Sequence, residues 1–255
     1  MTSHGHRSRG RCRVLPLILL CVASAQWAAQ WTFVPPARLV KGSPEAASPS
    51  AQAAHAAPAA AEQGGLFSAL AAYGHYLGLV LGTGCLVAER LMIKAGMSEE
   101  EEQTVLSIDS LYGLVGLLIA GTGYLRVTQY GKGWEFYQHE PIFWLKLTLA
   151  AILGAASFFV TATFIKRGLA RDEAKKTGSK SLAPVTEKLA DRLTSVINAQ
   201  LLAIGSIPLA ATLMARGVLY VDWFPWQAGA LPVVLMLGGL GFKYVKEAID
   251  WSEDE

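Results

Sequence analysis

Residues 107–147 constrain the fold of this chain more than any other segment. The segment consists of an apolar run, a short connection rich in aromatic and charged residues, and a second apolar run that carries Lys146 near its start. In lipid, every backbone polar group near the hydrocarbon needs a partner, and a helix supplies these partners within one segment. The pattern therefore predicts two membrane helices joined by a structured connection.

The composition indicates a multi-pass membrane protein. Of the 255 residues, 52% are hydrophobic and only 16% are charged, with a mean hydropathy of +0.33. Soluble domains carry about 25% charged residues, and here the apolar residues gather in several long runs. The formal net charge of +2, without a basic patch interleaved with aromatics, excludes a nucleic-acid partner. The expected fold class is all-α, a transmembrane bundle of four core helices and a fifth, with the lipid bilayer around it.

The first 25 residues have the pattern of a secretory signal peptide. Arginines at positions 7, 9, 11 and 13 precede an apolar run over residues 14–25 that ends in Ala-Ser-Ala. The run is too short to cross a bilayer about 30 Å thick, although a short first membrane helix is the alternative. Because Cys12 and Cys21 lie in this leader, Cys85 is the only cysteine expected after processing, which excludes an intrachain disulfide there.

Residues 26–62 have the composition of a plastid transit segment. They include Arg38, Lys41 and a tract of Ala, Ser and Pro in which Glu45 is the only acid. Such a tract buries too little apolar surface to fold and is expected to be disordered. The run Phe33-Val34-Pro35-Pro36 resembles the Phe-Val-Ala-Pro motif of bipartite plastid presequences in algae with secondarily acquired plastids. The resemblance implies a plastid membrane protein, of the thylakoid, whose mature chain begins between positions 57 and 65.

Four apolar runs predict a membrane domain over residues 63–217. The expected helices span about residues 66–94, 105–127, 141–165 and 193–215. Residues 218–255 follow as an aromatic interfacial segment, a fifth helix over about residues 228–244, and an acidic tail. Ser98 with Glu101 fits a capping box at the start of the second helix. The four glutamates at positions 99–102 are alternatively a metal site, although no His or Asp stands at ligand spacing.

Glycines indicate how the first two helices pack. Small residues that recur along a membrane helix allow a neighbouring helix to approach closely. Such residues occur in the first helix as Gly74, Gly78 and Gly82, and in the second as Gly113, Gly116, Gly121 and Gly123. His75 lies about 20° from Gly82 around the helix and is therefore expected to face the bundle.

Basic residues predict the orientation of the bundle. One side receives Arg90 and Lys94, which with Glu89 close the first helix, and also the segment 166–191, which is expected to be a large solvated basic loop. The opposite side receives only Arg126, Lys132 and Arg216. The first side, together with the C-terminus, is therefore expected to face the plastid stroma.

Short motifs run from the first predicted helix to the end of the fourth. An early histidine is present as His75, and Met-Ala-Arg-Gly closes the fourth helix at residues 214–217. Between them stand Asp109, Tyr112-Gly113, Leu125-Arg126-Val127, Lys132-Gly133, Tyr137, Pro141 with Phe143, and Lys146-Leu147. Over residues 70–217 the chain thereby resembles an uncharacterised family of predicted membrane proteins from bacteria and plastids, domain of unknown function 2214.

The same four-helix pattern is distantly similar to the HemJ-type protoporphyrinogen oxidase, a haem-containing membrane protein. The similarity implies haem b or another tetrapyrrole in a redox role. His75 is then the candidate axial metal ligand, and Arg126 and Lys146 are candidate partners of propionates on the same face. Trp144 stands where that family has a second histidine, so His139 would have to fold back to replace it. The candidate hydrogen-bonding tyrosines are Tyr112, Tyr124 and Tyr137.

Other interpretations stay open. In one, His75 is a structural histidine bonded to a neighbouring helix, and Arg126 and Lys146 anchor the bundle at the interface, the lysine by snorkelling. In another, the protein is a non-catalytic accessory or assembly subunit of a photosynthetic membrane complex, docking through its small-residue helix faces and its C-terminal segment. It would then need no cofactor, or at most a chlorophyll on His75. A transporter is disfavoured because neither an inverted repeat nor an acidic relay in the helix centres is visible. Since no nucleophile triad or phosphate loop is visible, whether the protein is an enzyme stays open.

Overall fold

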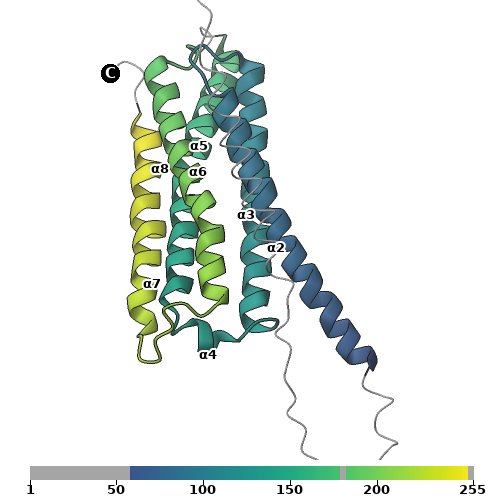
Figure 1. Cartoon of the computed structure of the whole chain (residues 1–255). Helices are drawn as coiled ribbons and strands as arrows, with labels where there is room; N and C mark the ends of the chain where they lie inside the picture. The colour runs from purple at the N-terminus through teal and green to yellow at the C-terminus, as the bar shows by residue number, and fades with distance from the viewer. Residues whose placement is uncertain (1–57, 179–181, 252–255) are drawn as a thin grey trace, which may run out of the picture.

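The computed structural model describes residues 58–178 and 182–251 (Figure 1). All regular elements in these residues are helical. They are α2 (Pro58–Met92), α3 (Glu99–Thr128), α4 (Trp134–Tyr137), α5 (Pro141–Thr177), α6 (Glu187–Ala215), α7 (Trp226–Val234), η1 (Leu235–Leu240) and α8 (Gly241–Asp250). The predicted signal peptide, most of the predicted transit segment and the acidic tail lie outside the described residues.

Within residues 58–178 and 182–251, five helices are long and apolar enough to cross a membrane, which confirms the predicted all-α, multi-pass bundle. They span Gly64–Met92, Glu99–Thr128, Pro141–Thr177, Glu187–Ala215 and Trp226–Asp250. The fifth consists of α7, η1 and α8 in succession and is longer than the predicted range 228–244. The π-helical η1 begins three residues after Pro232, which has no N–H to donate to the preceding turn.

The long helices alternate in direction through the bundle (Figure 1). α5 contacts α3, α6, α7, η1 and α8, whereas α2 packs on α3 and α6. The ends of α2, α5 and α8 and the starts of α3 and α6 lie together, and we call this the Glu102 end. The starts of α5 and α7 and the ends of α3 and α6 lie at the opposite Lys146 end, beside α4. The N-terminal half of α2 leans away from the other helices.

Small residues let α2 and α3 approach closely at three levels. A Cβ added at Gly78 would lie 2.5 Å from Ile119 Cγ1, and one at Gly74 would lie 3.2 Å from Thr122 Cγ2. The expected role of the α2 glycines is therefore confirmed. In α3, only Gly123 makes such a close contact. A Cβ added at Gly113, Gly116 or Gly121 would have no neighbour within 4 Å among the described atoms. Close packing by those three glycines is not found within the described part of the chain.

The prediction of a large basic loop over residues 166–191 is wrong. α5 continues to Thr177 and α6 begins at Glu187, so the connection covers residues 178–186. The apolar run stops near position 165, but the following Ala, Arg, Lys and Glu residues favour a helix as well as apolar residues do. Gly178, with φ of 65°, then ends the helix in the left-handed conformation that glycine adopts without strain.

The start of α3 has the predicted capping box. The Ser98 hydroxyl accepts a hydrogen bond from Glu101 N at 3.2 Å, and Ser98 N donates to Glu101 Oε2 at 2.9 Å. The helix therefore begins at Glu99, six residues before the predicted apolar range. Three of its four first glutamates, Glu99, Glu101 and Glu102, form ion pairs, and Glu101 also completes the capping box. No metal-binding group of three or more His, Cys, Asp or Glu occurs among the described residues.

Candidate functional site

His75 lies on the contact between α2 and α3, as its position beside the glycines predicts. Its Nδ1 is 3.1 Å from the Ile119 carbonyl oxygen and 3.2 Å from Thr122 Oγ1. Because a carbonyl only accepts hydrogen bonds, the Ile119 contact places the proton of a neutral imidazole on Nδ1. Nε2 then keeps its lone pair, and no described residue forms a hydrogen bond with it. The imidazole is therefore oriented by α3 and retains one unused acceptor.

Arg126 and Lys146 lie near His75, as predicted. Both cations act electrostatically on the imidazole and on each other. Arg126 stacks over Tyr76 of α2, with 5.1 Å between the guanidinium carbon and the ring centroid. Lys146 Nζ lies 5.7 Å from the ring centroid of Phe143. Among the described residues neither cation forms an ion pair, so a polar cluster with excess positive charge lies at the Lys146 end.

The predicted tyrosines do not all lie with this cluster. Tyr137 of α4 does, because its ring packs against Phe143 with centroids 5.3 Å apart. Tyr124 is 67% exposed on the outer face of α3. Tyr112 lies elsewhere in the bundle, near Gly82 and in electrostatic contact with Glu89 and Asp109. The structure thus brings together His75, Arg126, Lys146 and Tyr137 at one end and separates Tyr112 from them.

The second histidine at this end is bonded to the connection between α6 and α7. His139 Nδ1 lies 3.0 Å from the Phe224 carbonyl oxygen, in the connection between α6 and α7. Trp144 donates from its indole nitrogen to the Gln138 carbonyl at 2.9 Å. Both side chains brace the connections at the Lys146 end.

Glu140 is a buried acid that the sequence did not single out. It is fully buried at the N-cap of α5, and neither carboxyl oxygen has a hydrogen-bond partner among the described residues. Burial raises the pKa of Glu140 above its ordinary value, while the nearby Lys132 and Lys146 oppose this shift. The available signal was Pro141, since a proline at the first helical position places the preceding residue at the cap.

We expect Glu140 to make stability depend on pH. A raised pKa means that the folded protein retains a proton over a range where the unfolded chain has lost it. The stabilising contribution is present below the unfolded pKa and is lost as pH rises through the folded pKa. Glu140→Gln should therefore make the thermal unfolding temperature in detergent less dependent on pH. The difference from wild type should appear as the pH rises above the ordinary pKa of a glutamate. The exposed Glu135→Gln is the control, and identical wild-type and Glu140→Gln profiles would contradict the assignment.

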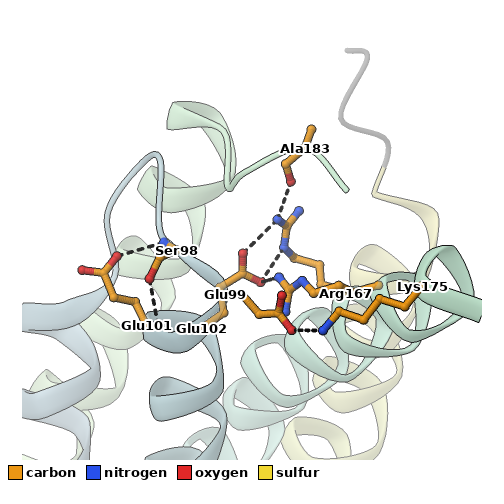
Figure 2. Close-up of polar contacts among 8 residues, drawn as sticks. Ser98, Glu99, Glu101, Glu102, Arg167, Lys175 and Ala183 are labelled. Carbon is orange, nitrogen blue, oxygen red and sulfur yellow. Dashed lines mark hydrogen bonds and ion pairs between the residues drawn. The ribbon is translucent and has the colours of Figure 1, made fainter. Parts of the chain in front are cut away.

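An ion-paired cluster closes the opposite end of the bundle (Figure 2). Glu102 of α3 is buried, and Arg167 of α5 donates a hydrogen bond to each of its carboxyl oxygens at 3.0 Å. Arg171 adds a second guanidinium at 2.7 Å from Glu102 Oε2. Arg167 also donates to the Ala183 carbonyl at 2.7 Å, and Lys175 pairs with Glu99. The cluster fastens the start of α3 to the end of α5 and to the connection before α6.

Glu89 is a further correction to the sequence analysis. It was expected to close α2 at the interface, but only 1% of its surface is exposed, and its Oε1 has no partner among the described residues. Asp109 is similarly buried and accepts a hydrogen bond from Thr161 Oγ1 at 2.6 Å. The sequence showed neither as interior, because nearby Arg90 and the glutamates at positions 99–102 suggested a polar interface.

Five membrane-length helices around buried polar groups define a multi-pass helical membrane protein. The chain belongs to the family described as predicted membrane protein, DUF2214, whose model matches residues 67–219. The match includes both polar ends of the bundle and stops before α7, so the fifth membrane helix lies outside it. Neither a curated protein nor a solved structure matches the chain.

Proposed function

We propose that the protein is an integral membrane protein of the plastid thylakoid that binds a haem through His75 and acts in redox chemistry. The observation that carries this proposal is the hydrogen bond between His75 Nδ1 and the Ile119 carbonyl. Histidines that ligate metals commonly donate their other ring N–H to a carbonyl, which fixes the tautomer and the ring orientation. His75 meets this requirement and presents Nε2 as the remaining nitrogen.

The charges around His75 favour haem over chlorophyll. Arg126 and Lys146 place two cations near the imidazole, and neither is paired with an acid among the described residues. Unpaired cations within a membrane helix commonly mark a functional site. A haem carries two propionates that they would neutralise, whereas the corresponding propionate of chlorophyll is esterified. Bound haem would supply one-electron chemistry, and the protein residues would hold and orient it.

An absorption spectrum of the full chain purified from its own membranes tests the proposal. We expect a Soret band and a sharpening of the visible bands when the sample is reduced, in proportion to the protein. A red absorption band that does not change on reduction would identify chlorophyll instead. Purified protein without Soret absorption would contradict haem binding.

We further propose that the Glu102 end faces the stroma. Most of the basic residues that flank the membrane spans lie at the Glu102 end, whereas those at the Lys146 end are Arg126, Lys132, Lys146 and Arg216. In a multi-pass membrane protein, the side with the excess of Lys and Arg is usually the side from which the chain is inserted. The leader, with its signal-like run and acid-poor tract, supports a plastid location.

Protease accessibility in sealed vesicles is expected to show this orientation. Protease on the stromal side should cut within residues 178–186 and leave residues 129–140 intact, because these connections lie at opposite ends of the bundle. Vesicles opened with detergent provide the control, since both connections then become accessible. Cleavage of only the 129–140 connection from the stromal side would reverse the orientation.

The second candidate function is an accessory or assembly subunit of a photosynthetic membrane complex. The observation that favours it is the outer face of α3, where Gly113, Gly116 and Gly121 are exposed and have open space beside them. A helix of another subunit could approach such a face closely. Protein that lacks visible absorption and comigrates with a photosynthetic complex in a native gel would support this function over haem binding.

A further inference from the structure

Two carboxyl groups lie at one level inside the bundle. Gly78 of α2 faces Ile119 and Gly82 faces Val115, so this antiparallel register brings Glu89 of α2 opposite Asp109 of α3. Glu89 is 1% exposed and Asp109 is 4% exposed, and the two groups interact electrostatically. Asp109 lies seven residues after Glu102 on α3, about 10 Å deeper along the helix axis. The pair therefore forms a second polar layer beneath the ion-paired cluster.

Four helices contribute to this inner layer. Thr161 of α5 donates to Asp109, and Tyr112 of α3 interacts with the Gln200 side chain of α6. Gln200 is 1% exposed and donates from Nε2 to the Leu153 carbonyl at 3.3 Å. Its Oε1 and Glu89 Oε1 are both buried without a hydrogen-bond partner among the described residues. Two acceptors thus remain unused in an interior where acceptors are normally satisfied.

The inner layer differs from the outer one in its charge balance. Glu102 is held by two guanidinium groups, whereas no ion pair reaches Glu89 or Asp109 from any described residue. Arg90, the neighbour of Glu89 in sequence, donates instead to Asn198 Oδ1 at 2.8 Å. The other titratable groups in electrostatic contact with the acids are Cys85 of α2 and Tyr112 of α3, and neither supplies a positive charge.

We propose that Glu89 and Asp109 together form an intramembrane proton-binding site that holds at least one exchangeable proton at neutral pH. Two ionised carboxylates without a counter-charge are strongly disfavoured in a low-dielectric interior. A proton on one carboxyl removes a charge and supplies a donor where acceptors are unused. The site lacks three His, Cys, Asp or Glu ligands at metal-binding spacing among the described residues, which favours a proton over a multivalent cation.

The proton exchanges with the aqueous phase at the Glu102 end. Glu89 is only three residues before the end of α2 at Met92, about 5 Å along the axis. In the other direction, His75 is fourteen residues away on α2, about 21 Å. The intervening contact is filled by Ile119 against Gly78. The proton site is therefore separate from the proposed haem site, and neither proposal depends on the other.

Infrared spectroscopy of the full chain in lipid bilayers tests this site. A protonated carboxyl gives a carbonyl stretch apart from the amide bands, and this stretch shifts in heavy water. We expect the band in wild-type protein at neutral pH, its loss as pH is raised, and a clear loss of intensity in Glu89→Gln and Asp109→Asn. Glu100→Gln, on the exposed face of α3, is the matched control and should leave the band unchanged.

Three results would overturn the proposal. The first is wild-type protein without the band at neutral pH, and the second is a band that both inner-layer variants retain at full intensity. The third is loss of the band when sodium or potassium is added at constant pH, which would identify a cation site. Folding is checked by circular dichroism. Because glutamine imitates a protonated glutamate, Glu89→Gln should fold, and its failure to fold would show that an ionised Glu89 is required.

Discussion

Replacement of His75 by alanine is expected to abolish the Soret absorption of the purified protein. Alanine removes an imidazole whose Nδ1 is held by a hydrogen bond to α3 and whose Nε2 has no partner among the described residues. Without an axial ligand, two cations alone would not retain the cofactor during purification. Absorption spectra normalised to protein concentration measure the loss, and circular dichroism confirms that the helices remain.

Matched variants separate ligation from packing. His139→Ala should keep the pigment, because the His139 imidazole is bonded to the Phe224 carbonyl in the connection between α6 and α7. Lys146→Met should weaken pigment retention without abolishing it, since it removes one of the two cations and keeps the apolar stem. A Cβ at Gly123 would lie 3.1 Å from His75 Cε1, so Gly123→Val should displace the imidazole and reduce binding. Unchanged Soret absorption in His75→Ala would exclude His75 as the ligand.

The largest expected loss of stability follows from Glu102→Ala. The substitution leaves the buried Arg167 guanidinium and the largely buried Arg171 without their carboxylate. Removal of one partner of a buried ion pair typically costs about 3–5 kcal/mol, because the remaining charge is buried without compensation. Unfolding of the full chain in mixed detergent micelles, followed by circular dichroism, measures the change. Glu102→Gln should cost less, since the amide keeps an oxygen acceptor for the guanidinium.

The neighbouring glutamates provide controls on the same turn of α3. Glu99 pairs with Lys175 on the surface, and loss of such an exposed pair should cost far less stability than loss of the buried one, because water and salt screen it. Glu100 is exposed and its side chain forms no ion pair among the described residues, so Glu100→Ala should change stability by about 0.5 kcal/mol or less. If Glu102→Ala lowered the stability no more than Glu99→Ala does, the prediction would be wrong, and the charges of the cluster would be screened by water.

The sequence was a good guide to the helices and a poor guide to their ends. Apolar runs predicted all five membrane helices, because the requirement for backbone hydrogen bonds in lipid leaves few alternatives. The end of α5 was missed because hydropathy falls at Lys166, while the helix continues through residues with high helix propensity. The buried Arg167 pairs with Glu102, which lies 65 residues earlier in the chain. Such a partner has no local signature.

The candidate site was predicted in the same uneven way. Helical spacing was sufficient to place His75 on the α2 contact face, since its neighbours Gly74 and Gly78 lie on the same helix. The grouping of His75 with Arg126 and Lys146 required only that consecutive helices be antiparallel. Glu89 and Glu140 were missed because their burial depends on distant segments: α3 and α6 enclose the first, and the connections at the Lys146 end enclose the second.

The long sequence separation between Glu102 and Arg167 also bears on how the protein is made. α2 and α3 are synthesised before α5, so the hairpin that they form contains the acids Glu89, Glu102 and Asp109 before any of their later neighbours exist. These acids would oppose stable insertion of the hairpin by itself. Completion of α5, which brings both Thr161 and Arg167, is therefore the step at which the nascent bundle becomes committed to the membrane.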